Sequence, residues 1–325
     1  MTTSDTVVVV GAGISGVACA RRVDSAGLPV VVLERGQRAG GRMASRTMYD
    51  RPVDLGAQYV TASDPAFRAV VDDWSARGVA RPWTDTFHTG DGRTLGPAKQ
   101  GPTRFAAPGG MRALVEDLAT GLDVRTGRTV ASVRAGADGP GVDGEPVRAV
   151  ALAMPDAQAA RVLTREDPAL ADSLDHTWSP TLALAAGWRA REWPVDGVFV
   201  DDAADPPVLT WIADDGRRRG DDAPVLVAHS SPELARTHLE RPERAGPALL
   251  AALIRQLGIE ATPEWTYVRP WGFSKPTTPR DESYRLLDPA GTLGVCGDGW
   301  STTPKVEAAW RSGDALGAAL VERLT

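Results

Sequence analysis

Apolar positions near the start of the chain follow the pattern of a strand, a helix and a second strand. Residues 6–10 form a short β-branched run that ends at glycine, which is typical of a buried parallel strand. Residues 14–26 repeat apolar side chains at helical spacing, and residues 29–33 form another apolar run. The pattern predicts one βαβ unit here.

The rest of the chain alternates less regularly. Further helices are predicted at 64–76, 111–120, 247–257 and 304–324, and further strands at 129–134, 147–153, 181–188, 197–200, 208–213, 225–229 and 291–299. Residues 80–108 are rich in Pro, Gly and Thr and predict loops or short strands, and residues 135–145 predict a long hairpin turn. Between about 165 and 270 the pattern favours an α+β block over further βαβ units.

Composition excludes several classes of protein. The 325 residues carry 36 basic and 42 acidic side chains, a net charge of −6, so no nucleic-acid partner is expected. Hydrophobic residues at 42 % are ordinary for a globular chain. Cys19 and Cys296 form no framework of disulfides, and the first residues match neither a signal peptide nor a membrane span. We expect a cytoplasmic protein, monomeric or homodimeric, with no membrane partner and no metal site.

The turn after the first predicted strand carries a dinucleotide-binding motif. Gly11, Gly13 and Gly16 form G-x-G-x-x-G, with Ile14 and Ser15 in the first turn of the helix. Gly11 permits a tight turn, Gly13 lets the backbone approach a pyrophosphate, and Gly16 lets helix and strand pack closely. The helix N-terminus offers free N–H groups to phosphates. Glu34 ends the next strand at the spacing expected for a carboxylate that binds the adenosine ribose.

Residues after Glu34 favour FAD as the dinucleotide. Glu34 and Arg35 are followed, after four residues, by Gly40-Gly41-Arg42, which resembles the signature of the flavin amine oxidase superfamily. The resemblance implies that Gly41 and Arg42 close over the FAD pyrophosphate, and a planar guanidinium suits phosphate oxygens. The alternative for Arg42 is a solvated loop arginine.

The end of the chain resembles the same superfamily. Gly297-Asp298 follows the last predicted strand, and the resemblance implies that this pair holds the pyrophosphate and ribityl chain. Lys305 and Val306 begin the last helix, whose N-terminus is implied to face the flavin pyrimidine edge. Cys296 is not at an obvious attachment position, so noncovalent FAD is expected.

Within the superfamily the sequence is most similar to renalase and its bacterial relatives. Residues 54–61, DLGAQYVT, match a motif that passes alongside the flavin ring in that group, and His229 and Trp271 fall in two further motifs. Pro270 and Gly272 replace the basic-aromatic run that usually flanks the tryptophan. The remaining FAD-contact candidates are Met43, Gly56, Ala57, Gln58 and, in the predicted strand 129–134, Val130.

The sequence contains few candidates for a catalytic base. The candidates for the chemical step are Gln58, Tyr59, Thr61, His229, Trp271 and Lys305. Of four histidines, only His229 lies in a context that indicates a site, and its alternative is a partnered residue at a strand end. Lys305 is placed to favour anionic reduced flavin or superoxide, or is merely exposed at a helix start. Tryptophans of the α+β block are interpreted as flat walls for a flat ring, or as core.

This scarcity of bases suits a donor that gives hydride without deprotonation. The renalase resemblance implies such donors: 2- or 6-dihydroNAD(P) isomers, oxidised to NAD(P)⁺ while O₂ becomes H₂O₂. NAD(P) is then a substrate, because no second G-x-G-x-x-G follows a strand. Two alternatives stay open. One is an amine oxidase or another desaturating flavin oxidase of the superfamily, and the other is an inactive carrier or interaction protein of this fold.

Segments implied to bind FAD occur at both ends of the chain. The expected fold class is α/β, a Rossmann-type FAD-binding domain of the glutathione-reductase-2 or p-hydroxybenzoate-hydroxylase kind, interleaved with an α+β substrate domain. The FAD-binding domain is expected at 1–60, 109–160 and 271–325, and the substrate domain at 61–108 and 161–270.

Overall fold

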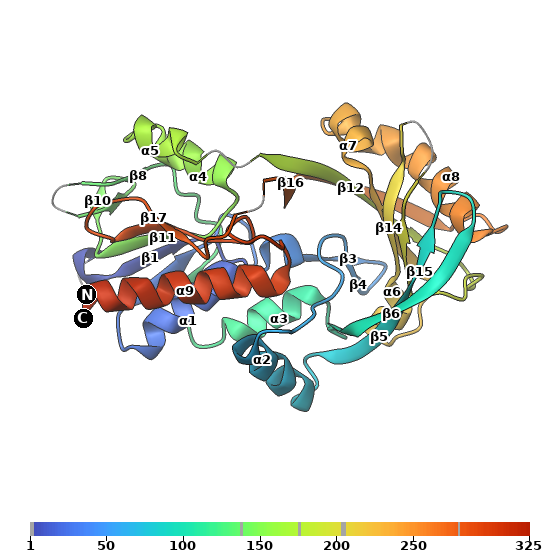
Figure 1. The fold of residues 1–325 in the computed structure, drawn as a ribbon, viewed down its shortest axis with the longest axis horizontal. Coiled ribbons are helices and arrows are strands. Elements are labelled where there is room, and N and C mark those ends of the chain that lie inside the picture. Colours follow the sequence, from blue (N-terminus) through green and yellow to red (C-terminus); the bar gives the residue numbers. More distant parts are fainter. Residues whose placement is uncertain (1–2, 137–138, 175–176, 203–205, 279) are drawn as a thin grey trace. The chain divides into compact units, whose positions relative to one another are not determined.

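The computed structural model describes residues 3–136, 139–174, 177–202, 206–278 and 280–325 (Figure 1). They form two compact units built from separate segments. Unit 1 comprises Met1–Arg42, Val115–Trp178 and Lys275–Thr325, and unit 2 comprises Met43–Leu114 and Ser179–Ser274. The assignment of FAD-binding and substrate domains stays a prediction. In the ranges described, no helix is both long and apolar enough to cross a lipid bilayer.

Unit 1 is built on a six-stranded sheet of order β17-β18-β11-β1-β2-β7. Its strands are β1 (Val7–Val10), β2 (Val30–Leu33), β7 (Asp123–Arg125), β11 (Ala149–Leu152), β17 (Arg285–Leu286) and β18 (Leu293–Val295). All neighbouring pairs run parallel except β17 with β18. The four valines of β1 are buried in the middle of the sheet, as the continuous apolar run requires.

Helices pack tightly on this sheet. The unit contains α1 (Ile14–Ser25), α4 (Asp156–Leu163), α5 (Pro168–Asp172), α9 (Val306–Leu324), the 3₁₀ turn η1 (Thr3–Asp5) and a small sheet of β8 (Val133–Arg134), β9 (Gly141–Val142) and β10 (Glu145–Pro146). Helices α1 and α9 lie side by side (Figure 1), so closely that a Cβ on Gly313 would lie 1.8 Å from the Ser15 carbonyl oxygen. Ala159 and Leu163 of α4 belong to the same hydrophobic core cluster as Val8 of β1.

Unit 2 is built on a seven-stranded sheet of order β16-β12-β15-β14-β13-β5-β6. Its strands are β5 (Arg81–Gly90), β6 (Leu95–Ala106), β12 (Trp178–Gly187), β13 (Gly197–Val200), β14 (Leu209–Asp214), β15 (Val225–Ser230) and β16 (Trp265–Pro276). The described pairings are antiparallel except that of β13 with β5. The register sets His229 of β15 between Ala183 of β12 and Trp211 of β14.

The two faces of this sheet carry different clusters. Around it lie α2 (Pro65–Ala76), α6 (Asp215–Arg219), α7 (Pro232–His238), the turn η3 (Pro242–Ala245), α8 (Gly246–Leu257) and the hairpin of β3 (Ser45–Met48) and β4 (Arg51–Asp54). Leu182, Leu184 and Leu226 pack with Leu249 and Leu253 of α8. Ala183, Ala185 and Val227, which alternate with them, pack with Val53 and Leu55. The turn η2 (Gly41–Met43) and helix α3 (Met111–Leu118) cross the boundaries between segments of the two units.

Several elements differ from the sequence prediction. Residues 80–108 are not loops or short strands, because β5 and β6 form a long hairpin. Strand β16 was not predicted at all. Both β6 and β16 are edge strands, where Pro102 and Pro270 are tolerated because an edge leaves some N–H groups unpaired. The predicted turn at 135–145 contains β9 and β10, apart from residues 137–138, which lie outside the described ranges. The predicted strand 129–134 is reduced to β8.

Candidate functional site

The first glycine loop of unit 1 leaves no room for side chains. Gly11 has φ +108°, and a Cβ there would lie 2.6 Å from the Ala153 carbonyl oxygen. A Cβ on Gly16 would lie 2.0 Å from the Gly11 oxygen and 3.0 Å from the Ala153 Cβ. The loop therefore requires glycine to turn and to bring α1 close to the sheet.

A second glycine loop lies directly against the first. Gly40 N donates to the Ala12 carbonyl oxygen at 2.8 Å, and Gly41 has φ +52°. A Cβ on Gly41 would lie 3.2 Å from the Gly13 Cα. Two backbones from distant parts of a glycine-rich sequence thus approach closely at the N-terminus of α1, where helical N–H groups and a partial positive charge favour phosphate.

Glu34 fixes the shape of this region. Its Oε2 accepts from Ala12 N at 2.9 Å, and its Oε1 accepts from Gly36 N at 2.7 Å. Each carboxylate oxygen retains a second lone pair for a ribose hydroxyl. Arg35 is exposed to solvent, and its position indicates no particular role.

Arg42 and Asp298 form a bidentate ion pair. Arg42 Nη1 donates to Asp298 Oδ2 at 3.0 Å, and Nη2 donates to Oδ1 at 2.5 Å, across 256 positions of sequence. The Arg42 guanidinium also lies over the Trp178 ring, 5.0 Å from its centroid. The two residues expected to hold a pyrophosphate therefore contact each other, and the planar fork of Arg42 is held in one orientation.

The start of α9 supplies further candidate residues. Gly297 N donates to Ser312 Oγ at 2.8 Å, which ties the end of β18 to α9. Lys305 Nζ forms an ion pair of 2.5 Å with Glu307, whose side chain is buried. Lys305 is therefore a paired residue, and not simply an exposed lysine at a helix start. Burial raises the pKa of Cys296 to about 12, so this thiol stays protonated.

Five further FAD-contact candidates are buried or half-buried. Ile14, Ser15 and Val130 are buried, Val306 is half-buried, and Met43, the first residue of unit 2, is buried.

In unit 2, two expected catalytic residues contact one backbone carbonyl. Trp271 Nε1 donates to the Leu55 oxygen at 2.9 Å, and His229 Nε2 lies 3.2 Å from the same oxygen. Burial lowers the pKa of His229 to about 4, partly offset by this hydrogen bond. His229 is therefore a neutral imidazole near neutral pH, and with Nε2 protonated it donates to Leu55. Both side chains fix the segment 54–58.

Other candidates in that segment are arranged around its backbone. Gln58 is buried, and its Nε2 donates to the Asp54 oxygen at 2.5 Å and to the Gly56 oxygen at 3.1 Å. Its Oε1 has no hydrogen-bond partner among the described residues. Gly56 and Ala57 are half-buried, as is Thr61, which follows a bridge between Val60 and Phe105.

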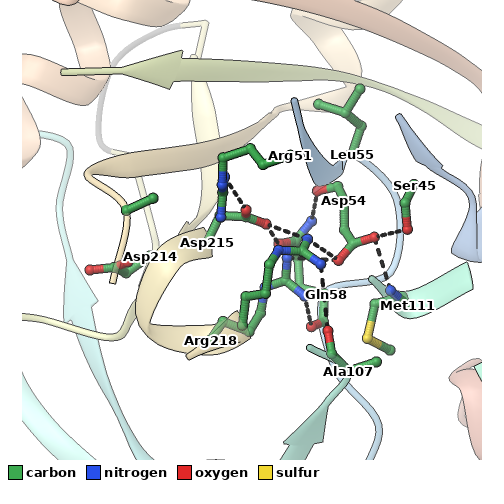
Figure 2. Close-up of polar contacts among 12 residues, drawn as sticks. Ser45, Arg51, Asp54, Leu55, Gln58, Ala107, Met111, Asp214, Asp215 and Arg218 are labelled. Carbon is green, nitrogen blue, oxygen red and sulfur yellow. Dashed lines mark hydrogen bonds and ion pairs between the residues drawn. The ribbon is translucent and has the colours of Figure 1, made fainter. Parts of the chain in front are cut away.

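Asp54, at the start of this segment, is the centre of a buried ion network (Figure 2). Its Oδ2 accepts from Arg218 Nη2 at 2.9 Å and from Arg219 Nη2 at 2.8 Å. Its Oδ1 accepts from Met111 N at 3.0 Å and from Ser45 Oγ. Figure 2 shows Ser45 and Met111 on one side of the Asp54 carboxylate and Arg218 of α6 on the other. The Asp54 side chain is only 1 % exposed, and every acceptor position of its carboxylate is used by a donor of the protein.

Asp215 completes the network. It pairs with Arg218, with Arg219 at 3.5 Å and with Arg51 at 2.8 Å, and Arg51 also pairs with Asp221 at 2.7 Å. Burial acts to raise the pKa of Asp215, but the three arginines outweigh it and lower the pKa to about 2.

The network holds two loops in place. Arg218 Nη1 donates to the Gln58 oxygen at 3.0 Å, and Arg219 Nη1 donates to the Pro108 oxygen at 3.2 Å. None of its charged residues was selected from the sequence as a functional candidate. The signal was present, however, because an acidic and basic run, Asp214–Arg219, directly follows an apolar strand.

Comparison with known proteins identifies the type of fold first. A family model described as an NAD(P)-binding Rossmann-like domain matches residues 9–74. This range contains both glycine loops and Glu34.

Individual relatives are flavin and polyamine oxidases. The chain is 44 % identical over 54 residues to polyamine oxidase 4 of Oryza sativa subsp. japonica, 40 % over 67 residues to putrescine oxidase of Kocuria rosea, and 53 % over 55 residues to flavin-containing amine oxidase B of Homo sapiens. These matches cover 17 %, 21 % and 17 % of this chain, and only 11 %, 14 % and 11 % of the respective relatives.

Solved structures match over the whole chain. Putrescine oxidase bound to putrescine aligns with a TM-score of 0.72 at 18 % identity, covering 99 % of this chain and 100 % of that one. Cyclohexylamine oxidase from Brevibacterium oxydans IH-35A aligns with a TM-score of 0.76 at 13 % identity, covering 99 % of each. The expected fold class is thereby confirmed: a Rossmann-like domain joined to mixed α/β structure, in the fold of the amine oxidases.

Proposed function

We propose that this chain is a FAD-dependent oxidoreductase of the amine-oxidase type, with FAD bound noncovalently. One observation carries the proposal: two glycine loops meet at the N-terminus of α1 so closely that a Cβ on Gly41 would lie 3.2 Å from the Gly13 Cα. Bare backbone at a helix N-terminus suits a pyrophosphate. Two of the oxidases that are similar to this chain, amine oxidase B of Homo sapiens and of Sus scrofa, are named as flavin-containing.

The residues around these loops fit FAD. Glu34 has free lone pairs for an adenosine ribose, and its two backbone contacts hold it at the loop. Arg42 presents a planar donor fork whose direction is set by Asp298 and Trp178. When bound, FAD supplies a ring that accepts a hydride.

The electron donor that we propose is a 2- or 6-dihydronicotinamide isomer of NAD(P)H. His229 contacts Leu55 and Lys305 pairs with Glu307, so both of these expected titratable residues are engaged with other groups of the chain. A dihydropyridine needs no base, because it loses hydride and becomes aromatic. Hydride leaves the donor to give NAD(P)⁺, and O₂ with one proton takes up the two electrons and the hydrogen as H₂O₂.

In this mechanism the chain's residues position the donor and exclude water. His229 and Trp271 fix the Leu55 carbonyl, and Arg218 fixes that of Gln58. The segment between them is therefore held rigidly, as a surface for positioning a flat substrate must be. Gln58 at the end of that segment, and Tyr59 and Thr61 just after it, are the residues that we assign to substrate or flavin.

Amine oxidation is the second candidate. It is favoured by the names of the similar proteins, which include putrescine oxidase and cyclohexylamine oxidase. An amine must be deprotonated before or during hydride loss, so this function requires a proton acceptor for the substrate.

Anaerobic mixing separates these possibilities. The purified protein should be yellow, and borohydride-reduced NAD⁺, which contains several dihydro isomers, should bleach its flavin absorbance rapidly. Enzymatically made NADH, with only the 4-dihydro isomer, serves as the control, and putrescine and cyclohexylamine test the alternative. Rapid bleaching by an amine, with none by the borohydride mixture, overturns the donor assignment. A colourless protein that does not take up FAD overturns the oxidoreductase assignment and favours a carrier of this fold.

A further inference from the structure

Unit 2 contains a cluster of aromatic rings around Phe87. The ring centroids of Tyr59, Trp83 and Trp211 lie 5.5, 5.2 and 4.8 Å from that of Phe87. Phe199 adds a fourth ring at 5.6 Å and is 49 % exposed. Tyr59 and Trp83 are half-buried, so the cluster has flat apolar surface accessible from solvent.

Two hydrogen-bond donors next to Phe87 have no acceptor. The Arg104 guanidinium lies 3.9 Å from the Phe87 centroid, and the residue is only 8 % exposed. Arg104 Nη1 and Trp83 Nε1 are both buried, and neither atom has a hydrogen-bond partner among the described residues. A buried N–H without an acceptor is costly, and more so on a charged group.

Two neighbouring groups, Tyr59 and Asp85, interact with Arg104. Burial raises the pKa of Tyr59, although the charge of Arg104 and a hydrogen bond from it oppose the shift, so the Tyr59 hydroxyl stays a neutral phenol near neutral pH. Asp85 feels the Arg104 charge, but its carboxylate already accepts from Gln100 Nε2 at 2.8 Å and from Thr86 Oγ1 at 2.7 Å. Despite these neighbours, Arg104 Nη1 has no acceptor among the described residues.

We propose that the Phe87 cluster binds a planar ring whose attached carboxamide or carboxylate oxygen accepts a hydrogen bond from Arg104 Nη1. The rings supply stacking surface, and Trp83 Nε1 supplies a second donor. The choice of ligand rests on the proposed function, because the proposed electron donor, a dihydronicotinamide, is a flat ring that carries a carboxamide. A buried guanidinium disfavours the ammonium group of a protonated amine, so the same residue selects against amine substrates.

Ligand binding to the FAD-loaded wild-type protein tests the site without any variant. Benzamide, nicotinamide and benzoate carry the ring and the acceptor, ethylbenzene carries neither charge nor acceptor, and benzylamine carries a cation of similar size. Titration calorimetry should show the carbonyl ligands binding at least about tenfold more tightly than ethylbenzene or benzylamine. Equal affinities across the series, or no binding of any carbonyl ligand, overturn the proposal.

Substitution then assigns the donor. Arg104→Met should weaken benzamide binding roughly 10- to 100-fold and leave ethylbenzene unchanged. Arg93→Met, at an exposed arginine in the turn of the same hairpin, should change neither. If Arg104→Met does not fold, Arg104→Lys keeps the cation without the planar fork and should weaken benzamide alone. Carboxamide affinity that is unchanged in the folded variants overturns the site, even if dihydronicotinamides reduce the flavin. Arg104-dependent carboxamide binding without flavin reduction overturns only the donor assignment.

Discussion

Replacing Asp54 by asparagine tests whether the buried ion network holds unit 2 together. In the wild type, Arg51, Arg218 and Arg219 face Asp54, Asp215 and Asp221, three positive against three negative charges. The Asp54→Asn change leaves one positive charge in excess. The new amide also brings an N–H toward donors that are already in place on both sides of the carboxyl group.

The expected cost follows from burial. The side chains of Asp54, Arg218 and Arg219 are 1 %, 0 % and 2 % exposed, so solvent cannot replace the lost acceptor. Breaking such a buried pair by removing one partner costs about 3–5 kcal/mol of unfolding free energy. A surface pair provides the matched control: Arg77, 46 % exposed and paired with Asp73, should lose only about 0.3–0.5 kcal/mol as Arg77→Ala.

Urea unfolding followed by intrinsic fluorescence measures both variants, and far-UV circular dichroism checks that Asp54→Asn is folded before denaturant is added. Tryptophans occur in both units, and Trp74, Trp193 and Trp211 report on unit 2. A loss below about 1 kcal/mol in Asp54→Asn would show that the arginines find other acceptors, and would refute the reasoning from burial.

Three further outcomes are expected. Arg42→Met should weaken FAD binding by about 1.5–3 kcal/mol in equilibrium titration, whereas Arg38→Met, at an exposed arginine paired with Glu116, should not; equal affinities would remove Arg42 from the cofactor site. His229→Asn should retain FAD but slow flavin reduction about 10- to 100-fold in stopped flow, because Leu55 loses a positioning contact. The pKa of His229 in the folded protein is lowered from 6.5 to about 4, so its contribution to stability is complete above pH 6.5 and is lost as the pH falls toward 4. An inflection near pH 6.5 in the wild-type rate of flavin reduction, caused by His229, would contradict this assignment. Gly313→Ala should lower thermal stability by about 1–3 kcal/mol, because its Cβ meets the Ser15 oxygen, whereas Gly246→Ala, with only an ordinary 3.5 Å contact to Val268, should change it little; similar stability losses in both would contradict close helix packing as the cause.

Local chemistry explains which parts of the fold were predictable from the sequence. Gly11 and Gly16 could be interpreted because a positive φ and close helix–strand packing each impose glycine within a few residues. The strands β1 and β2 were visible as unbroken apolar runs. Edge strands β6 and β16 were hidden, because half-exposed positions and prolines erase the alternation that marks a strand.

Long-range pairing explains what was missed in the candidate site. Asp54 and Arg218 are 164 positions apart, and no spacing rule links a carboxylate after one strand to a basic turn after another. The shared contact of His229 and Trp271 with Leu55 likewise depends on sheet register. Arg104 looked like one basic residue among 36 until its burial and the missing acceptor of its Nη1 were known.

The discontinuous sheet of unit 1 has a consequence for protein synthesis. Strands β1 and β2 leave the ribosome before unit 2, whereas β18 (residues 293–295) and α9 (residues 306–324), which pack against β11 and α1, follow it. The segments of unit 2 end at Ser274, so all of them are translated before the last segment of unit 1, which contains β18 and α9, is available to complete that unit. Domains tend to fold as units during translation. The proposed FAD site is therefore completed only after β18 and α9 have been translated, and capture of the cofactor is not expected before that point.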